Sequence, residues 1–427
     1  MKLRALAILS MLLLAGCSSG QAGKSSSTNL DDKIRIEYWH VNAETQGGLS
    51  VETLVNEFNA QSDTIEVVPK YNADMYSGLL RNFQAEVAAG NTPAIVQVGW
   101  AFLEYFGNNF AYVMPQDIIS DYFPEDESYL EDNFLANILE LAQNSDGSQL
   151  GLPYSLSTPV LYLNLDLLES AGLDTAGPST WIEVQEYAEI IKQETGKYGL
   201  YIQEPADNWA TQALLESNGA RLITDGLASF ASEEGIEAYS LYADMVNDNL
   251  ALHISWDEGV SAFNAGEIGM LYTTIARSAS ILASIDFNIA TVPSPEWDNQ
   301  EKRIPAGGAF LAITATTPET QQAAWEFQKF LYEVDSVVEW SLGTGYVPPT
   351  KAFEGDALNP ILEQNPLMQP AVQQMYAVVP WTSFPGDSGL EAEQILLDVR
   401  DQILGGSVSA SDGLTAAQHK INAILGN

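Results

Sequence analysis

The alternation of strand-like and helix-like segments after residue 33 limits the fold more than any other feature of this chain. Residues 34–39 have the two-residue period of a strand, and residues 49–60 carry apolar side chains at helical spacing. Residues 65–68 are rich in β-branched side chains, residues 75–89 are again helical in pattern, and residues 94–98 form a short apolar run. The order strand, helix, strand, helix, strand predicts a parallel or mixed α/β sheet.

A second set of segments repeats this alternation further along the chain. It predicts strands over residues 160–163 and 198–202 and a helix over residues 180–194, with Ser179 or Thr180 as its N-cap. Helices are also expected over residues 209–217, 233–247, 259–264, 318–332, 392–404 and 414–425. A chain of 427 residues is too long for one ordinary core, so two domain-sized units are expected.

The charge balance excludes several classes of partner. The chain has 17 Lys and Arg against 57 Asp and Glu, a formal net charge of −40. Such a field repels phosphate backbones and anionic membrane surfaces, so no nucleic acid is expected as a partner. Hydrophobic residues make up 46% of the chain, which is enough to build folded cores and excludes general disorder. The acidity fits either a need for solubility or a saline medium whose ions screen the self-repulsion.

The amino terminus has the features of an export signal. Lys2 and Arg4 precede an apolar run that ends at Leu14 and is too short to span a bilayer. The segment Leu14-Ala15-Gly16-Cys17 resembles the bacterial lipobox, which implies removal of residues 1–16 and attachment of a lipid to Cys17, the only cysteine. Residues 17–29 are rich in Ser and Gly and predict a tether with a root-mean-square reach of about 20 Å. The expected product is a folded body anchored to the membrane, facing the periplasm or cell exterior.

No motif in the sequence indicates catalysis. His40, His253 and His419 lie far apart, and none has a second His or Cys at metal-ligand spacing. The nucleophile elbow, the phosphate-binding loop and the dinucleotide-binding fingerprint are all absent from the sequence. The many carboxylates make any single Asp/Glu pair uninformative about a glycosidase. We therefore expect no metal, no cofactor and no enzymatic activity.

Nine short segments share an order and spacing that are more specific than any one of them. They are Tyr38-Trp39-His40, Phe58-Asn59-Ala60, residues 90–98, residues 151–164, Ala171-Gly172-Leu173, Pro178-Ser179-Thr180-Trp181, residues 263–270, residues 307–310 and Thr344-Gly345-Tyr346-Val347-Pro348. Together they resemble the family 1 extracellular solute-binding proteins of bacterial ABC importers, which include maltose-, oligosaccharide- and glycerol-3-phosphate-binding proteins. The resemblance covers nearly the whole mature chain.

The resemblance implies an α/β fold of two lobes, of the type II-like periplasmic-binding-protein class, with hinge crossings and a ligand cleft between the lobes. Crossings are expected near residues 153–155, near residues 305–309 and after Tyr346, where Pro and Gly suit a hinge. The implied lobes are residues 30–153 with 309–357, and residues 154–308 with 358–427.

Ligand contacts are also implied by the resemblance, which is greatest to the glycerol-3-phosphate-binding branch. The matching positions are Tyr76, Ser157, Trp209, Thr274, Gly308 and Tyr346. Two positions depart from that branch. Its glutamate after the third strand is replaced by Gly99-Trp100, and its late arginine is missing near Ala392 or Glu393.

These departures favour a neutral sugar over a phosphate. A phosphate dianion favours a charge-assisted donor such as a bidentate arginine, whereas aromatic rings cover the C–H faces of sugars. Trp39, Trp100 and Trp381 are therefore added as candidate contacts. Arg277 and Arg400 remain as arginines that could clamp a phosphate.

The expected function is capture of a mono- or oligosaccharide by a monomeric, lipid-anchored protein, which delivers it to the permease subunits of an ABC importer. Three alternatives remain open at this point. They are binding of glycerol 3-phosphate or a glycerophosphodiester, degradation of glycans by an exported enzyme, and a lipoprotein receptor that feeds a sensor.

Overall fold

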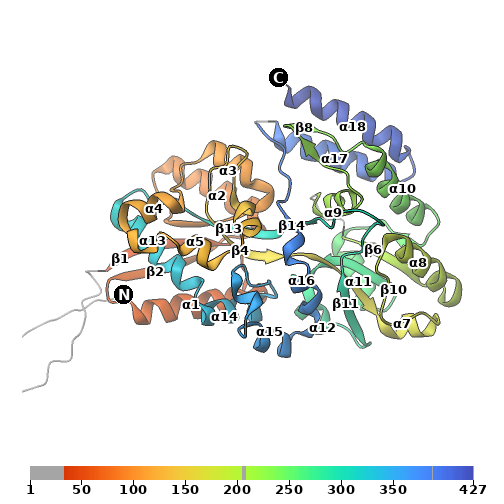
Figure 1. Ribbon diagram of the computed structural model, residues 1–427, viewed down its shortest axis with the longest axis horizontal. Coiled ribbons are helices and arrows are strands. Elements are labelled where there is room, and N and C mark those ends of the chain that lie inside the picture. Colours follow the sequence, from red (N-terminus) through yellow and green to blue (C-terminus); the bar gives the residue numbers. More distant parts are fainter. Residues whose placement is uncertain (1–32, 204–207, 387, 427) are drawn as a thin grey trace, which may run out of the picture.

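The computed structural model describes residues 33–203, 208–386 and 388–426, and these fold into two lobes that lie side by side (Figure 1). The predicted signal peptide, Cys17 and the tether lie outside the described residues. None of the described helices combines the length and apolar character needed to span a bilayer.

The first lobe is built on a five-stranded sheet in the order β2-β1-β3-β13-β4. Its strands are β1 (Ile34–His40), β2 (Ile65–Tyr71), β3 (Ile95–Gly99), β4 (Leu152–Ser157) and β13 (Gly307–Ile313). The first three strands are parallel, and β13 runs antiparallel to both of its neighbours. The main helices of this lobe are α1 (Gly48–Gln61), α2 (Met75–Ala89), α3 (Leu103–Asn109), α4 (Pro115–Tyr122), α13 (Pro318–Leu331) and α14 (Val334–Thr344).

The second lobe has a mixed sheet in the order β11-β5-β10-β6-β9. Its strands are β5 (Pro159–Asn164), β6 (Tyr198–Ile202), β9 (Ala251–Leu252), β10 (Ile268–Thr274) and β11 (Ile289–Pro293). Its helices include α7 (Leu165–Ser170), α8 (Trp181–Thr195), α10 (Glu233–Asn247), α11 (Trp256–Asn264), α12 (Ser278–Leu282), α17 (Gly389–Leu404) and α18 (Ala410–Leu425). Strand β5 is buried along its whole length because helices and loops cover both faces of the sheet.

The chain passes between the sheets at three places. Strand β4 ends at Ser157 and β5 begins at Pro159, so Thr158 is the first crossing. The second crossing runs through β12 (Ile304–Pro305) into β13, and β14 (Val378–Val379) follows the third crossing. Strands β12 and β14 pair in parallel, so the segment after the third crossing lies beside the second crossing.

The first crossing lies later in the chain than the sequence predicted. Residues 153–157 belong to the first sheet because Pro153 and Ser155 lie opposite residues of β13, and β13 itself already begins at Gly307. Helix α15 (Leu358–Gln364) packs against α14, and α16 (Gln369–Gln373) packs against β5 and β11. The third change of lobe therefore lies between these two helices.

Helix α9 (Trp209–Ser217) ties the second lobe to the paired crossing strands. Gln212 donates a hydrogen bond of 3.0 Å to the carbonyl oxygen of Pro380, just after β14. Arg303, just before β12, forms a 2.9 Å ion pair with the buried Glu216. Burial raises the pKa of Glu216, and the charge of Arg303 partly offsets that rise. Helix α9 thus contacts the chain next to both β12 and β14.

Several predicted elements have the bounds expected from the sequence. Helices 75–89, 209–217 and 233–247 are confirmed to the residue. Thr180, and not Ser179, is the N-cap of α8, because its side chain accepts a hydrogen bond from the Glu183 amide and the Glu183 carboxylate accepts one from the Thr180 amide.

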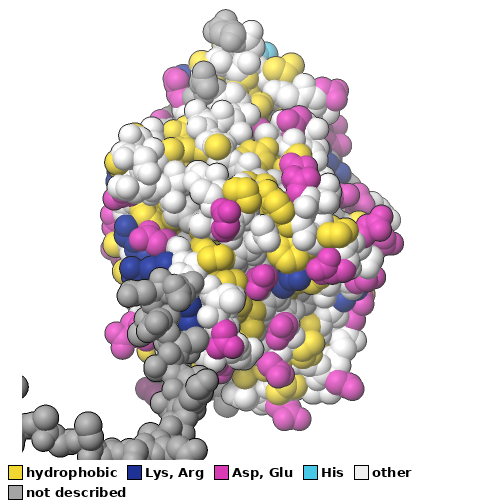
Figure 2. Space-filling model, turned by 90° about the vertical axis from the view of Figure 1, so that its left-hand side faces the viewer, with side chains coloured by type: hydrophobic (Ala, Val, Ile, Leu, Met, Phe, Trp, Pro, Cys, Tyr) yellow, Lys and Arg dark blue, Asp and Glu magenta, His cyan; other side chains and the backbone are white. Residues whose placement is uncertain are grey.

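Acidic side chains are spread over the end of the first lobe that Figure 2 presents, where they alternate with hydrophobic side chains. Spreading like charges over a solvent-exposed face limits their mutual repulsion.

Candidate ligand-binding site

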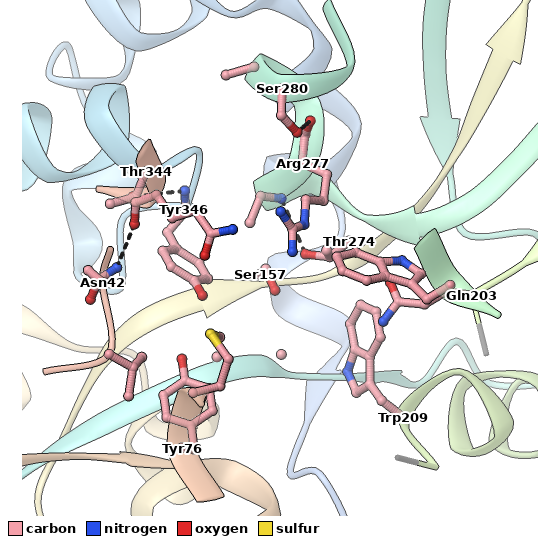
Figure 3. A pocket seen from close by; sticks show the side chains of 18 of the residues that line it. Asn42, Tyr76, Ser157, Gln203, Trp209, Thr274, Arg277, Ser280, Thr344 and Tyr346 are labelled. Atoms are coloured by element: carbon pink, nitrogen blue, oxygen red, sulfur yellow. Dashed lines mark hydrogen bonds between the residues drawn. The ribbon is translucent and has the colours of Figure 1, made fainter. Parts of the chain in front are cut away.

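A cavity of about 480 Å³ lies between the two lobes and is lined from both (Figure 3). The first lobe contributes Val41, Asn42, Gln46, Met75, Tyr76, Gly343, Thr344 and Tyr346, and the second contributes Gln203, Trp209, Trp256, Thr274, Ala276, Arg277, Ala279 and Ser280. Ser157, Gly307 and Gly308 lie in first-lobe strands beside the crossings, and Trp381 lies shortly after β14; all four also line the cavity. Six of the positions predicted from the sequence, Tyr76, Ser157, Trp209, Thr274, Gly308 and Tyr346, thus line one cavity, together with Trp381.

The sheets explain why these residues meet. Ser157 ends β4 and Thr274 ends β10, so each side chain emerges at a strand end that faces the other lobe. Gly308 lies opposite Leu156 and has φ +110, a backbone conformation that favours glycine. A Cβ there would lie 2.0 Å from the Ser155 carbonyl oxygen, so glycine is required for close packing of β13 on β4.

Two tyrosines face one another across the cavity (Figure 3). The Tyr76 hydroxyl is buried, and the hydroxyls of Tyr346 and Ser155 lie near it. Burial raises the pKa of Tyr76 and of Tyr346 above the ordinary value for a phenol, so both rings are neutral at physiological pH. Tyr346 stacks on the buried Trp340, with ring centroids 6.1 Å apart. These hydroxyls are suited to hydrogen-bonding a polar ligand.

Tryptophans line the opposite side of the cavity. The Trp209 indole donates a 3.0 Å hydrogen bond to the carbonyl oxygen of Pro305, which fixes its orientation against the hinge. The rings of Trp209 and Trp381 have centroids 6.2 Å apart. These rings present apolar faces next to polar groups, an arrangement that suits ligands with both C–H and hydroxyl surfaces.

Two amides in the cavity were missed by the sequence analysis. The Thr273 hydroxyl donates to Oε1 of Gln203, which leaves the amide NH₂ of Gln203 toward the cavity (Figure 3). Asn42 donates to the Gln46 carbonyl oxygen at 3.0 Å, and its buried Oδ1 has no partner among the described residues. A single amide in a loop carries no sequence signal, so only the fold reveals these two.

A positive charge also lies in the cavity. The guanidinium carbon of Arg277 is 4.2 Å from the ring centroid of Trp256. Partial burial lowers the pKa of Arg277, but a guanidinium stays protonated at neutral pH. Arg400 lies elsewhere, on α17, where it pairs with Asp401 at 3.0 Å. Of the two arginines that the sequence left open as a phosphate clamp, Arg277 lines the cavity and Arg400 does not.

Trp100 lies next to a second cavity of about 540 Å³ rather than in the first. The two cavities share Met75, Tyr76, Gly308 and Trp381. Only 1% of Trp100 is exposed, and its ring stacks on Phe310 with centroids 5.6 Å apart.

Trp39 lines neither cavity. It is 1% exposed, donates a 2.8 Å hydrogen bond to Glu37 and packs edge-on against Phe83. Trp39 is therefore a core residue of the first lobe and is left out of the site. Within residues 33–203, 208–386 and 388–426, His, Cys, Asp and Glu side chains form no group of three that could hold a metal ion.

Comparisons with known proteins agree with this architecture. The sn-glycerol-3-phosphate-binding periplasmic protein UgpB of Escherichia coli K12 is 28% identical over 363 residues, which cover 80% of each chain. The crystal structure of UgpB from Mycobacterium tuberculosis in complex with glycerophosphocholine superposes with a TM-score of 0.81 at 20% identity, covering 92% of this chain and 98% of that one. The cyclic α-maltosyl-1,6-maltose-binding protein of Arthrobacter globiformis gives a TM-score of 0.79 at 22% identity, with coverages of 92% and 99%.

These two superpositions establish the two-lobe solute-binding fold. The family model for bacterial extracellular solute-binding proteins matches residues 53–370, well over half of the sequence. This chain therefore belongs to the bacterial extracellular solute-binding protein family.

Proposed function

We propose that this protein is the substrate-binding component of an ABC importer and that it captures a carbohydrate between its lobes. The observation that carries this proposal is the combination of five aromatic rings with amides and hydroxyls in one cavity shared by both lobes. Aromatic rings stack on the C–H faces of sugars, while amides and hydroxyls bind their hydroxyl groups. The family assignment and the sugar-binding structural relative support the same class of function.

The proposed movement is closure of the lobes about the three crossings. We assign residues 33–157, and residues 307 to the end of α15, to the first lobe, and we assign residues 159–305 and the chain from α16 onward to the second. A ligand that contacts both lobes has higher affinity for the closed state and shifts the population toward it. The closed form would then present its ligand to the permease subunits.

The proposed cellular setting follows from the amino terminus. The mature chain begins at Cys17, is held to the membrane by its lipid, and acts as a monomer outside the cytoplasm. It carries out no reaction on its ligand. Mass spectrometry of the membrane-extracted protein tests the anchor, because a diacylglyceryl group on an amino-terminal Cys17 is expected.

The test of the ligand class is a thermal-shift panel on the purified protein. The panel contains mono- and oligosaccharides, glycerol 3-phosphate and glycerophosphodiesters. A carbohydrate at 100 times its Kd is expected to stabilise the folded state by about 2.7 kcal/mol. Chromatography of the incubated sugars tests the alternative of a glycan-degrading enzyme, since products would contradict a pure binding role.

A second candidate ligand is glycerol 3-phosphate or one of its diesters. The 28% identity to a glycerol-3-phosphate-binding protein over 363 residues favours it. Stabilisation by glycerophosphates alone in the same panel would establish this candidate and exclude the carbohydrate.

A further inference from the structure

Arg277 differs from the other arginines that the structure describes. Arg35, Arg81, Arg221, Arg303 and Arg400 each have a carboxylate oxygen within 4.0 Å. Arg277 has none among the described residues, although the chain holds 57 acidic residues against 17 basic ones. In so acidic a protein an arginine without an ion pair is the exception, and this one lines the interlobe cavity.

The backbone around Arg277 is held in place by local hydrogen bonds. Arg277 ends the short turn that follows β10, and the Thr274 hydroxyl accepts a 3.2 Å hydrogen bond from the Ala276 amide in that turn. The Ile275 amide donates to the carbonyl oxygen of Thr158, the first crossing residue, at 3.1 Å. The turn is thus attached to the hinge, and the guanidinium points into the cavity between Tyr346 and Thr274 (Figure 3).

Trp256 covers one face of the guanidinium at 4.2 Å. This contact occupies the π face and leaves the N–H edges for a ligand. The charged and titratable groups that act on Arg277 are Tyr346, Asp257 and Tyr162. Asp257 stands next to Trp256 on α11 and acts on Arg277 through its charge, but among the described residues no carboxylate oxygen, that of Asp257 included, lies within 4.0 Å of the guanidinium.

We infer that the cleft recognises a ligand that carries an oxyanion, a carboxylate or a phosphate, and that Arg277 binds this group. The inference rests on the proposed function, and it narrows the carbohydrate to an acidic sugar or a sugar phosphate and keeps the polyol phosphates of the second candidate ligand. The aromatic rings would bind the C–H faces of the ligand and the amides its hydroxyls. A bidentate guanidinium–oxyanion pair would offset the cost of this partly buried charge, which has no carboxylate partner among the described residues.

The test uses isothermal titration calorimetry with glucose, glucuronate, glucose 6-phosphate and glycerol 3-phosphate as probes. The proteins are the wild type, Arg277→Met, Arg277→Lys and the matched control Arg35→Met. Arg35 is an exposed arginine that pairs with Glu66 and lines neither interlobe cavity. A melting curve for each variant verifies folding, and Arg277→Lys keeps the charge if the Met variant is unstable.

At least one acidic probe should bind the wild type about 10- to 100-fold more tightly than glucose. Arg277→Met should remove most of that preference, Arg277→Lys should keep part of it because it lacks the planar fork, and Arg35→Met should change nothing. A preference for glucuronate identifies the oxyanion as a carboxylate, whereas a preference for the phosphates identifies a phosphoryl group.

Other outcomes separate this inference from the proposed function. Tight binding of glucose with no acidic preference, or stabilisation by neutral oligosaccharides alone, would overturn the inference and leave a carbohydrate-binding role standing. Binding of glycerol 3-phosphate alone, lost in Arg277→Met, would support the inference and contradict the carbohydrate assignment. An equal loss for all four probes in Arg277→Met would indicate a structural role and refute anion recognition.

Discussion

The guanidinium carbon of Arg277 lies 4.2 Å from the ring centroid of Trp256, so the turn after β10 and helix α11 together form one wall of the cleft. The relationship matters because both residues belong to the same lobe. The cation is therefore oriented within one lobe, and a ligand does not have to order it. In the proposed closure, Tyr76 of the first lobe would approach this preformed wall.

Replacing the aromatic platform should weaken recognition of acidic probes. Trp256→Leu keeps an apolar side chain but removes the cation–π contact, so the affinity for the best acidic probe should fall about 5-fold. Calorimetric titration measures the change. The matched control is Tyr198→Leu, since Tyr198 has Lys192 over its ring at 4.2 Å but lines neither interlobe cavity. An equal loss of affinity in both variants would contradict an orienting role for Trp256.

Trp100 and Trp381 both line the second cavity, but we expect their replacement to have different effects, on folding stability for Trp100 and on ligand affinity for Trp381. Trp100→Ala removes a buried ring stacked on Phe310 and should lower the free energy of unfolding by about 3–5 kcal/mol. Trp381 is only partly buried and lines both cavities, so Trp381→Ala should chiefly reduce ligand affinity. Urea unfolding and titration of each variant check this. Unchanged stability in Trp100→Ala would show that the ring is not part of the core.

Gly308 should be intolerant of even a methyl group. At φ +110 a Cβ would lie 2.0 Å from the Ser155 carbonyl oxygen, so Gly308→Ala must displace β13 from β4 beside the site. A stability loss of at least about 3 kcal/mol and weaker ligand binding are expected. Gly90→Ala is the control, because Gly90 has φ +84 with no atom within 4 Å of the added Cβ. It should cost only about 1–2 kcal/mol and leave binding unchanged.

The buried His40 should make the protein less stable in mild acid. Burial lowers the pKa of His40 to about 4, below its ordinary value of 6.5. Between these values the unfolded chain binds a proton that the folded protein does not, so stability falls as the pH decreases from 6.5 to 4. One such group contributes about 3 kcal/mol over this range. Urea unfolding at a series of pH values should show a shallower decline for His40→Gln, and parallel curves for variant and wild type would refute this assignment.

The sequence predicted local structure well where one helix face or cap carries the signal. Helix 75–89 has apolar residues at a helical period and ends at Gly90, which caps it in the left-handed conformation. The sequence left Ser179 and Thr180 open as the N-cap of the helix over residues 180–194, and the capping box of Thr180 with Glu183 decides for Thr180. The first crossing was predicted too early in the chain because the sequence around Pro153 resembles a hinge. In the structure, Pro153 lies in β4, the edge strand of the first sheet, where a proline is tolerated.

The sequence alone determined the alternation of strands and helices and the order of motifs that indicated a two-lobe solute-binding protein, and it predicts an export signal that ends at the single cysteine. Only the tertiary structure decided which aromatic rings face the cleft. Trp39 and Trp209 were both candidate ligand contacts from the sequence, yet one packs in a core and the other lines the cavity. The structure also decided that Arg277, and not a late-helix arginine, supplies the charge. The physical reason is that hydrophobic periodicity indicates on which face of its own helix or strand a residue lies. A binding site, in contrast, is formed where elements that are distant in sequence meet.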